Sequence, residues 1–462
     1  MRLSNHRHFV YFEEYEMSGS MSRRSVFAAG LAATSTVFVS GAAVAERGTT
    51  SDTPVDEGVD FFAWETAEHW ASGEAAGTVA TDGDRPGIRI GRPVDTVDFA
   101  DPHTGNTTSF DVATWTSPEY ESQVAAGELI ASWNVDAPEG TWVQVDMQGR
   151  YTDGESTPWF IMGRWAAGDG DIARASVAQQ GDSRSTVYTD TLAVDDPTTT
   201  RLTAFRLRVT LHRLAGTDVS PTVWRLGAMT SHVPVRYEVP ASTPGVGTGI
   251  ELDVPRYSQS IHAGRYPEYG GGGQAWCSPT SSQMVLEYFG RTVAPEDMAW
   301  VDPAYEDPQI CHAARSTYDN QYDGCGNWPF NAAYAGDFDD IEAVITRLNS
   351  MDEAEALIAA GFPIITSQSF LEEELDGAGY GTAGHLMVLI GFTADGDVIA
   401  NDPSSPSNDA VRRVYDRRQF ENIWLRTRRK DANGNDAGGS GGVCYLFRER
   451  GTQWPAHLRL PG

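Results

Sequence analysis

Residues 60–235 are predicted to form β-strands, because apolar and polar positions alternate along several short runs. The segment Ala204–His212 alternates in this way, which is typical of a half-buried antiparallel strand. Residues 142–147 and 159–162 are further runs, and turn formers such as Asp153-Gly154 lie between them. No long segment with a helical period interrupts these runs. We therefore predict an all-β sandwich or jelly roll over residues 60–235.

The second half of the chain begins with a helical period instead. Ser281, Met284, Val285 and Tyr288 occupy one face of a predicted helix, which Gly290 ends. We predict further helices over residues 340–348, 353–360 and 418–425, and strands over 363–367, 385–392, 397–401 and 443–447. A helix followed by strands is an α+β order, so the chain is predicted to be multidomain.

A stretch rich in proline, glycine, serine and threonine separates the two halves. Residues 240–249 show no apolar periodicity, which favours a linker. The predicted domains are therefore 60–235 and 251–462, with linkers over 46–59 and 236–250. Because few contacts usually cross such a boundary, residues 250–462 are expected to fold alone.

The N-terminus is typical of a secretory signal. Residues 1–45 form the predicted signal region, and its true start is expected at Met21. Arg23-Arg24 is followed by Phe27, a weakly apolar run and the small-residue site Ala43-Val44-Ala45, as in a twin-arginine signal. The alternative is an uncleaved anchor, since residues 26–45 could span a bilayer. We expect a secreted protein with no stable membrane insertion after cleavage.

The net charge of the chain excludes some classes of binding partner. The 462 residues carry 64 acidic and 34 basic side chains, a formal net charge of −30. Such a chain is repelled by nucleic acid and by anionic membrane surfaces, so neither is expected as a partner. Four cysteines are too few for a disulfide scaffold and too widely spaced for a zinc site of the Cys-x-x-Cys kind.

Cys277 is the candidate nucleophile. Pro279 suits the first turn of a helix and Ser278 suits its N-cap, so Cys277 is expected just outside a helix N-terminus. The positive end of a helix favours the thiolate form of a cysteine, which is the nucleophilic form. The upstream glycines would let a substrate backbone approach closely. The alternative interpretation is an ordinary buried cysteine.

A histidine and a carboxylate downstream strengthen the catalytic interpretation. His385 lies at the start of an apolar strand, and Asp402 follows the next strand after the turn Asp395-Gly396. A hairpin of this length would bring Asp402 back beside His385. A cysteine, a histidine and an orienting carboxylate are the groups that acyl transfer requires.

These three blocks resemble the C39-like cysteine peptidases, a branch of the papain-like fold. The resemblance covers roughly residues 250–450, and its motifs are Trp276–Ser281, Gly384-His385 and Asn401–Pro403. It implies Cys277 as nucleophile, His385 as general base and later acid, and Asp402 as the residue that orients the imidazole. The family also has an upstream glutamine as oxyanion donor, for which Gln259 is favoured over Gln274.

Two weaker features concern a disulfide and a glycan. Cys311 and Cys325 flank a short loop and could form a disulfide in an oxidising compartment. Eight tryptophans lie in the predicted sandwich, and exposed ones could stack on sugars, although most tryptophans belong to cores.

The sequence thus predicts a secreted thiol hydrolase that acts on peptide or amide bonds through a thioester, without cofactor or metal. A peptide or protein is the expected substrate, and cell-wall glycan is a further candidate partner through the sandwich. The alternatives are a non-catalytic glycan- or cell-wall-binding protein with a relic peptidase domain, and a cell-wall amidase or transferase.

Export gives a direct test of the N-terminal interpretation. Replacing Arg23 and Arg24 together by lysine should retain the precursor inside the cell, because twin-arginine export depends on that pair. Immunoblotting of cell and medium fractions checks this, and the exported wild-type protein should begin at or near Glu46. Normal secretion of the double variant would contradict the assigned route.

Overall fold

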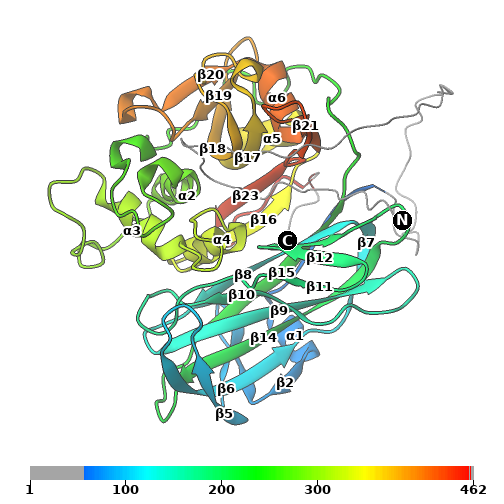
Figure 1. Ribbon diagram of the computed structural model, residues 1–462, viewed down its shortest axis with the longest axis vertical. Helices are drawn as coiled ribbons and strands as arrows, with labels where there is room; N and C mark the ends of the chain where they lie inside the picture. Colours follow the sequence, from blue (N-terminus) through cyan, green and yellow to red (C-terminus); the bar gives the residue numbers. More distant parts are fainter. Residues whose placement is uncertain (1–56, 457, 459–462) are drawn as a thin grey trace, which may run out of the picture.

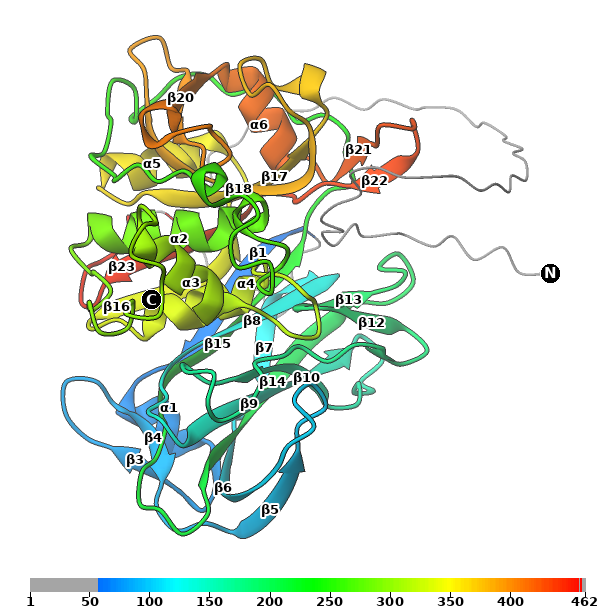
Figure 2. The same cartoon turned by 60° about the vertical axis from the view of Figure 1, so that its left-hand side comes forward.

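The computed structural model describes residues 57–456 and 458 (Figure 1). The signal region 1–45 and most of the linker 46–59 lie outside the described residues. Two β-sheets stack in the N-terminal part, and a third sheet with most of the helices forms the C-terminal part (Figures 1 and 2). Within the described range, no helix is long and apolar enough to cross a membrane.

The N-terminal part contains an eight-stranded and a seven-stranded sheet. The first has the order β11-β12-β13-β8-β15-β4-β3, with β1 also pairing with β15; the second has the order β10-β9-β14-β6-β2, with β5 on β6 and β7 on β14. The paired strands are antiparallel. The strands of the first sheet are β1 (Gly58–Trp64), β3 (Thr78–Thr81), β4 (Gly87–Ile90), β8 (Glu128–Asp136), β11 (Gln180–Gly181), β12 (Ser185–Tyr188), β13 (Thr191–Val194) and β15 (Thr222–His232). Those of the second are β2 (Glu74–Ala76), β5 (Asp95–Ala100), β6 (Thr107–Thr116), β7 (Tyr120–Ala126), β9 (Thr141–Tyr151), β10 (Phe160–Trp165) and β14 (Leu202–Leu214). A short helix, α1 (Ala67–Ser72), follows β1.

The alternating runs of the sequence lie in these strands. The predicted strand Ala204–His212 is the middle of β14, which pairs with β9 along most of its length. Its buried positions include Phe205, Leu207, Val209 and Leu211, which belong to the core between the sheets. Alternation at period two therefore located the strands correctly, because one face of each is covered.

Seven of the eight tryptophans of this part are buried in cores: Trp64, Trp70, Trp115, Trp133, Trp142, Trp165 and Trp224. The eighth, Trp159, is half-buried, and the Arg208 guanidinium lies 4.5 Å from the centroid of its ring. The tryptophans therefore serve packing, and they form no row of exposed rings.

The C-terminal part is built on a six-stranded sheet of order β16-β23-β17-β18-β19-β20, antiparallel throughout. One face of the sheet packs on α2 and α4, and the other on α5 and α6. The strands are β16 (Ile341–Arg347), β17 (Ile364–Phe370), β18 (Thr382–Phe392), β19 (Val398–Asn401), β20 (Arg412–Tyr415) and β23 (Val443–Glu449), with a separate hairpin of β21 (Arg428–Lys430) and β22 (Asp436–Gly438). The helices are α2 (Cys277–Tyr288), α3 (Pro308–Thr317), α4 (Trp328–Gly336), α5 (Met351–Ala359) and α6 (Arg417–Leu425), and the short 3₁₀ helices are η1 (Gln259–His262), η2 (Gly273–Ala275), η3 (Glu372–Glu374) and η4 (Asn408–Ala410).

The helix predicted over residues 340–348 is wrong, because this segment is strand β16. Ile341, Ala343 and Ile345 face one core, whereas Val344 faces the other. A strand buried on both faces is a continuous apolar run, and such a run does not distinguish a strand from a buried helix. Helices α3 and α4 were not predicted, whereas α2, α5 and α6 lie close to their predicted ranges.

The predicted linker 236–250 is anchored to the C-terminal part. Val239 is buried, its backbone N–H donates to the Asn422 side chain, and the Gly247 N–H donates to Glu355. Just beyond it, the Leu252 N–H donates to the Ile390 carbonyl of β18. The composition that predicted a linker therefore belongs to a segment with fixed contacts along its length.

The two parts share a hydrophobic core. Strand β8 of the sandwich packs against α4 and β16 (Figure 1). The rings of Trp133 and Trp165 contact Phe330 edge-on, with ring centroids 6.2 and 5.4 Å apart. A hydrogen bond also joins the two parts at the start of α4. The Trp328 N–H, at the first residue of α4, donates to the carboxylate of Asp190, the residue before β13. The sandwich thus covers apolar surface of the C-terminal part.

Polar groups reinforce this interface. The fully buried side chain of Asn134 donates to the carbonyls of Ala332 and Ala343 and accepts from the Ala343 N–H. The buried Arg225 guanidinium lies 2.6 Å from Glu65 and 3.3 Å from Glu342 of β16. This interface argues against the expectation that residues 250–462 fold alone. Without the sandwich, the fragment would expose an apolar face and would lose the partners of polar groups that the interface buries.

Asn134 offers a test of this coupling. Replacing Asn134 by alanine removes the side-chain partner of one buried N–H and of three buried carbonyls, those of Trp133, Ala332 and Ala343, so the free energy of unfolding should fall by about 2–4 kcal/mol. Urea unfolding followed by tryptophan fluorescence measures this. Asn106 is an exposed loop residue, and Asn106→Ala should change stability by less than about 0.5 kcal/mol. Equal effects of the two substitutions would contradict a shared core.

Candidate active site

Cys277 is the first residue of helix α2. The helix begins earlier than the sequence predicted: Trp276 occupies the N-cap position, and the Thr280 N–H donates to its carbonyl. Ser278 is therefore not the cap, and its hydroxyl instead hydrogen bonds to the Tyr445 hydroxyl at 2.8 Å. The prediction of a cysteine at a helix N-terminus holds, because Cys277 still lies beside the unpaired N–H groups of the first turn.

The glycines before Cys277 shape the loop that reaches it. Gly270, Gly271 and Gly272 have φ values of +64°, +88° and +111°, which side-chain-bearing residues rarely adopt. A Cβ atom on Gly273 would lie 2.5 Å from the Gln259 carbonyl oxygen. We expected these glycines to admit a substrate backbone; the close approach at Gly273 is instead to the protein's own 3₁₀ helix η1.

His385 lies between Cys277 and Asp402. Its ring nitrogen Nε2 is 2.8 Å from Oδ1 of Asp402, and its ring also hydrogen bonds to the side chain of Cys277. Cys277, His385 and Asp402 are 4%, 4% and 1% exposed, so all three residues are buried. The hairpin of β18 and β19 brings His385 and Asp402 together, as the sequence spacing predicted.

Asp402 accepts four hydrogen bonds. The Tyr380 and Tyr415 hydroxyls donate to Oδ2 at 2.8 and 2.7 Å, and the Ser404 N–H donates to Oδ1 at 2.9 Å beside His385. The neighbouring Asn401 points away, because its amide donates to the carbonyls of Val254 and Pro255. The carboxylate therefore has fixed partners on both oxygens, and the ring of His385 is oriented by one of them.

This environment favours the charged forms of both His385 and Asp402. Burial lowers the pKa of His385, but the Asp402 carboxylate and the Cys277 side chain outweigh burial and raise that pKa to about 10. Burial raises the pKa of Asp402, but the charge of His385 and the hydrogen bonds from His385, Tyr415 and Tyr380 lower it overall. At neutral pH the pair is therefore an imidazolium beside a carboxylate.

Gln259 and Gln274 differ in what their amide groups contact. Gln274 uses both ends within its own loop: it accepts from the Gly264 N–H and donates to the Gly271 carbonyl. Gln259 is buried, donates once to the Gln274 carbonyl at 2.7 Å, and its Oε1 has no partner among the described residues. Its backbone N–H donates to the carbonyl of Pro403, next to Asp402. Each carboxamide donates one of its two N–H groups and retains the second; Gln259 differs from Gln274 in being buried and in having its backbone held beside Asp402.

The predicted disulfide between Cys311 and Cys325 is absent. Both side chains are buried thiols: Cys311 Sγ is 3.6 Å from Nδ1 of His262, and the Cys325 thiol donates to the Ala314 carbonyl. Both cysteines belong to one small apolar cluster with Trp276, so they serve packing as free thiols. In the part of the chain that the structure describes, no group of three or more His, Cys, Asp or Glu side chains could hold a metal ion.

Tyr380 and Tyr415 are the site residues that the sequence analysis missed. Tyr380 precedes β18 by two residues, and Tyr415 ends β20. Neither belongs to a motif, and a tyrosine hydroxyl near a carboxylate is visible only once the strands are paired. In the sequence, each is only an aromatic residue near the end of a strand, and many tyrosines share that position.

Comparison with known proteins gives two family matches. Residues 60–231 match the model of the Peptidase C39 N-terminal domain, and residues 251–432 match the model of the Peptidase_C39 like family. A crystal structure of a C39-like peptidase from Bacillus anthracis aligns at 16% identity and a TM-score of 0.26, covering 44% of this chain and 98% of that one. A TM-score this low does not establish a shared fold. No curated protein matches the chain.

The charge state of the pair predicts a pH dependence of stability. The pKa of His385 is raised in the folded state, so its contribution is fully present below about pH 6.5 and is lost as pH rises towards 10. We compare the wild type with the double variant His385→Gln/Asp402→Asn, which removes both titrating groups and leaves no buried charge unpaired. The stability advantage of the wild type should be largest near pH 6 and should shrink by pH 10.

Urea unfolding at pH 6, 8 and 10 measures this difference. The lowered pKa of Asp402 adds a second loss only at acidic pH, as pH falls below about 4. A wild-type advantage that is constant or grows between pH 6 and 10 would contradict a protonated His385.

Proposed function

We propose that this chain, which belongs to the C39-like peptidase family, is a cysteine peptidase whose catalytic residues are Cys277, His385 and Asp402. The observation that carries the proposal is His385: one side of its ring contacts the Cys277 side chain, and Nε2 lies 2.8 Å from a buried carboxylate. A thiol, an imidazole and a carboxylate in this order are the parts of a thiol hydrolase. A helix that carries the cysteine and packs on a sheet that carries the histidine also supports a papain-like fold for residues 251–462.

In the proposed mechanism the proton of Cys277 resides on His385 before substrate binds. The raised pKa of His385 favours this, and the first turn of α2 stabilises the negative charge on sulfur. The thiolate attacks the carbonyl carbon, and the resulting oxyanion accepts hydrogen bonds from the Gln259 amide and the Cys277 backbone N–H. His385 then gives its proton to the leaving amine, and the thioester forms.

Water completes the reaction. His385, now neutral, takes a proton from water, the water attacks the thioester, and the imidazolium returns with the free acid product and the thiolate. Asp402 keeps the ring oriented and stabilises its positive charge throughout, and Tyr380 and Tyr415 hold Asp402. The backbone bond of Gln259 to Pro403, next to Asp402, supports its role as oxyanion donor over Gln274, whose carboxamide is held at both ends within its own loop.

We place this activity outside the cell, after export by the twin-arginine signal and cleavage near Ala45. The substrate is a peptide or protein. A cell-wall amidase or transferase would use the same triad and differ only in the group that accepts the acyl chain. A non-catalytic glycan-binding protein is the second candidate, but the buried tryptophans of the sandwich offer no stacking surface, and only Trp159 is partly accessible.

Variants of the triad test the proposed function. Cys277→Ala should abolish hydrolysis of a peptide library and leave the melting temperature nearly unchanged, because it removes one small side chain. Asp402→Ala should lower the rate by about 10³–10⁴-fold and leave residual activity, since Asp402 orients the base without reacting itself.

Labelling with iodoacetamide separates an active site from a relic. Cys277 in the wild type should react faster than a free thiol, and His385→Ala should slow that reaction. Cys311→Ala is the matched control: burial raises the pKa of Cys311 to about 12, so labelling should be unchanged when it is removed. A Cys277 that reacts no faster than a free thiol, or full activity of Cys277→Ala, would contradict the proposal.

A further inference from the structure

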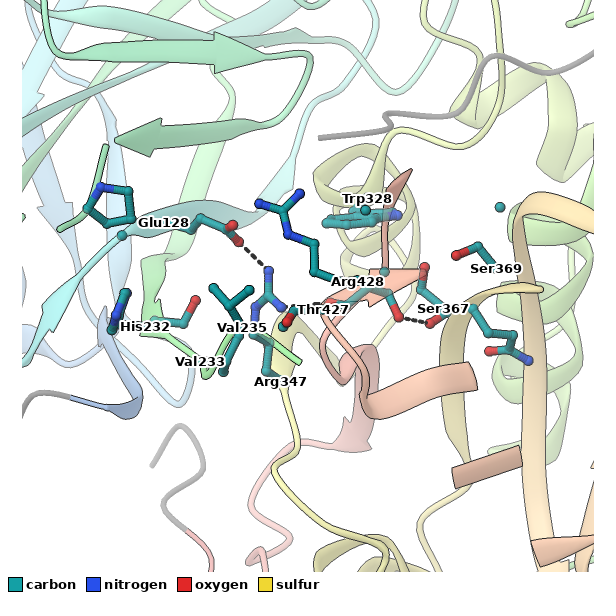
Figure 3. Close-up of a pocket in the computed structure, with 18 of the residues that line it drawn as sticks. Glu128, His232, Val233, Val235, Trp328, Arg347, Ser367, Ser369, Thr427 and Arg428 are labelled. Carbon is teal, nitrogen blue, oxygen red and sulfur yellow. Dashed lines mark hydrogen bonds and ion pairs between the residues drawn. The ribbon is translucent and has the colours of Figure 1, made fainter. Parts of the chain in front are cut away.

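A cavity of about 90 Å³ lies between the sandwich and the C-terminal part, next to the proposed triad (Figure 3). Gly384, the residue before His385, forms part of its wall, and an ion pair between Arg347 and Glu128 joins the two parts there. The cavity therefore borders the proposed base. The turn that carries the proposed oxyanion donor, Gln259, does not line it. Other contacts must therefore place the Gln259 amide.

The turn that carries Gln259, residues 258–260, is tied to the loop that follows Asp402. The Gln259 N–H donates to the Pro403 carbonyl at 2.9 Å. The hydroxyls of the two neighbouring serines donate to the next two carbonyls of the loop: Ser260 to Ser404 and Ser258 to Ser405. Three successive carbonyls of the loop therefore each accept a hydrogen bond from the turn.

The same loop also holds Asp402. The Ser404 N–H donates to Asp402 Oδ1 at 2.9 Å, the oxygen that also faces Nε2 of His385. The Ser405 N–H donates to the Asp402 backbone carbonyl at 3.2 Å. One segment, residues 402–408, thus contacts both the carboxylate that orients the base and the turn that carries the proposed oxyanion donor. Its position determines the position of both groups.

Asn408 joins this segment to the turn through its side chain. Its Oδ1 accepts from the Ser258 N–H at 2.7 Å, and its Nδ2 donates to Oδ2 of Asp307 at 2.7 Å. Because opposite ends of one carboxamide are bonded, the orientation of the Asn408 side chain is fixed on both sides. The bond to Ser258 comes from a side chain of the loop, so a substitution can remove it without changing the loop backbone.

Asp307 binds Asn408 instead of capping its own helix. It occupies the N-cap position of α3 with a φ of +47°, and its side chain accepts no cap hydrogen bond from that helix. An aspartate at an N-cap ordinarily accepts from the first turn, and residues other than glycine rarely have a positive φ. The Asp307 carboxylate is therefore directed to the side chain that holds the turn.

We propose that Asn408 is a positioning residue for this reaction: its side chain holds the turn of residues 258–260 so that the Gln259 amide lies where the oxyanion forms. The inference rests on the proposed function, in which Gln259 donates to that oxyanion. Asn408 acts through Gln259 and takes no part in the chemistry itself. The oxyanion forms only as the thiolate attacks, so a misplaced donor lowers kcat and leaves KM nearly unchanged.

Kinetics of peptide hydrolysis test this role. Asn408→Ala should lower kcat by about tenfold and keep KM within about twofold of the wild type. In a Gln259→Ala background the same substitution should change kcat by less than about twofold, because both substitutions act through one donor. Iodoacetamide should label Cys277 at the wild-type rate in Asn408→Ala, since alkylation of a thiolate forms no oxyanion. Asn433→Ala, exposed in the turn between β21 and β22, is the matched control and should change neither constant.

An exchange of two side chains tests the contact with Asp307. Asn408→Asp alone keeps the acceptor for the Ser258 N–H, but it loses the donor to Asp307 and brings two carboxylates together. Its kcat should fall at least as far as that of Asn408→Ala. Asp307→Asn/Asn408→Asp restores a donor and an acceptor between the two positions, so kcat should return to within about threefold of the wild type. A double variant no better than Asn408→Asp would contradict the contact as the cause.

Hydrogen exchange separates the positioning of the turn from the chemistry. The backbone N–H groups of residues 258–260 should exchange about tenfold faster in Asn408→Ala than in the wild type, and Asn433→Ala should leave them unchanged. If no peptide is cleaved but this exchange is faster, the proposed function fails and the hold of Asn408 on the turn stands. If peptides are cleaved and Asn408→Ala keeps kcat, or its effect multiplies with that of Gln259→Ala, the positioning role is overturned and the peptidase stands. An unchanged exchange rate overturns the positioning role in either case.

Discussion

The buried carboxylate of Asp402 is the group on which the site depends. A charge at 1% exposure is costly unless it is fully paired, and here four donors pair it: His385, Tyr380, Tyr415 and Ser404. These donors come from β18, from the segment before it, from β20 and from the turn after β19. Satisfying one carboxylate therefore fixes the relative positions of several strand ends, and with them the orientation of the His385 ring towards Cys277.

The same need for paired groups explains why the two parts of the chain act as one body. Asn134 of the sandwich bonds to buried backbone groups of the C-terminal part, and Arg225 pairs with Glu342, which also pairs with Arg448. Asp190 accepts from the first turn of α4. Apolar contacts of Trp133 and Trp165 with Phe330 surround these bonds. The sandwich is thus a structural neighbour of the proposed active site, and its strand ends form one wall of the adjoining cavity.

Much of this arrangement was predictable from the sequence, for physical reasons that can be named. Strand β14 alternates because one face is buried. The large apolar side chains of α2 recur at helical spacing, although small and polar residues complete a helix that β18, α3 and α4 bury along residues 277–286. The spacing of His385 and Asp402 fits a hairpin, so their meeting followed from local geometry. Strand β16 was mistaken for a helix because both of its faces are buried, and no period remains. The tyrosines that hold Asp402, and the C-terminal contacts that hold the linker, depend on pairings between distant segments, which no local pattern records.

The central claim is that Cys277 forms a covalent acyl intermediate. Intact-protein mass spectrometry of a reaction quenched in acid within the first turnovers, followed by peptide mapping, tests it most directly. The account predicts a mass increase equal to the acyl half of the substrate, located on the peptide that contains Cys277 and removed by hydroxylamine. Turnover with no acyl adduct on Cys277 under conditions that preserve thioesters, or an adduct on another residue, would contradict it.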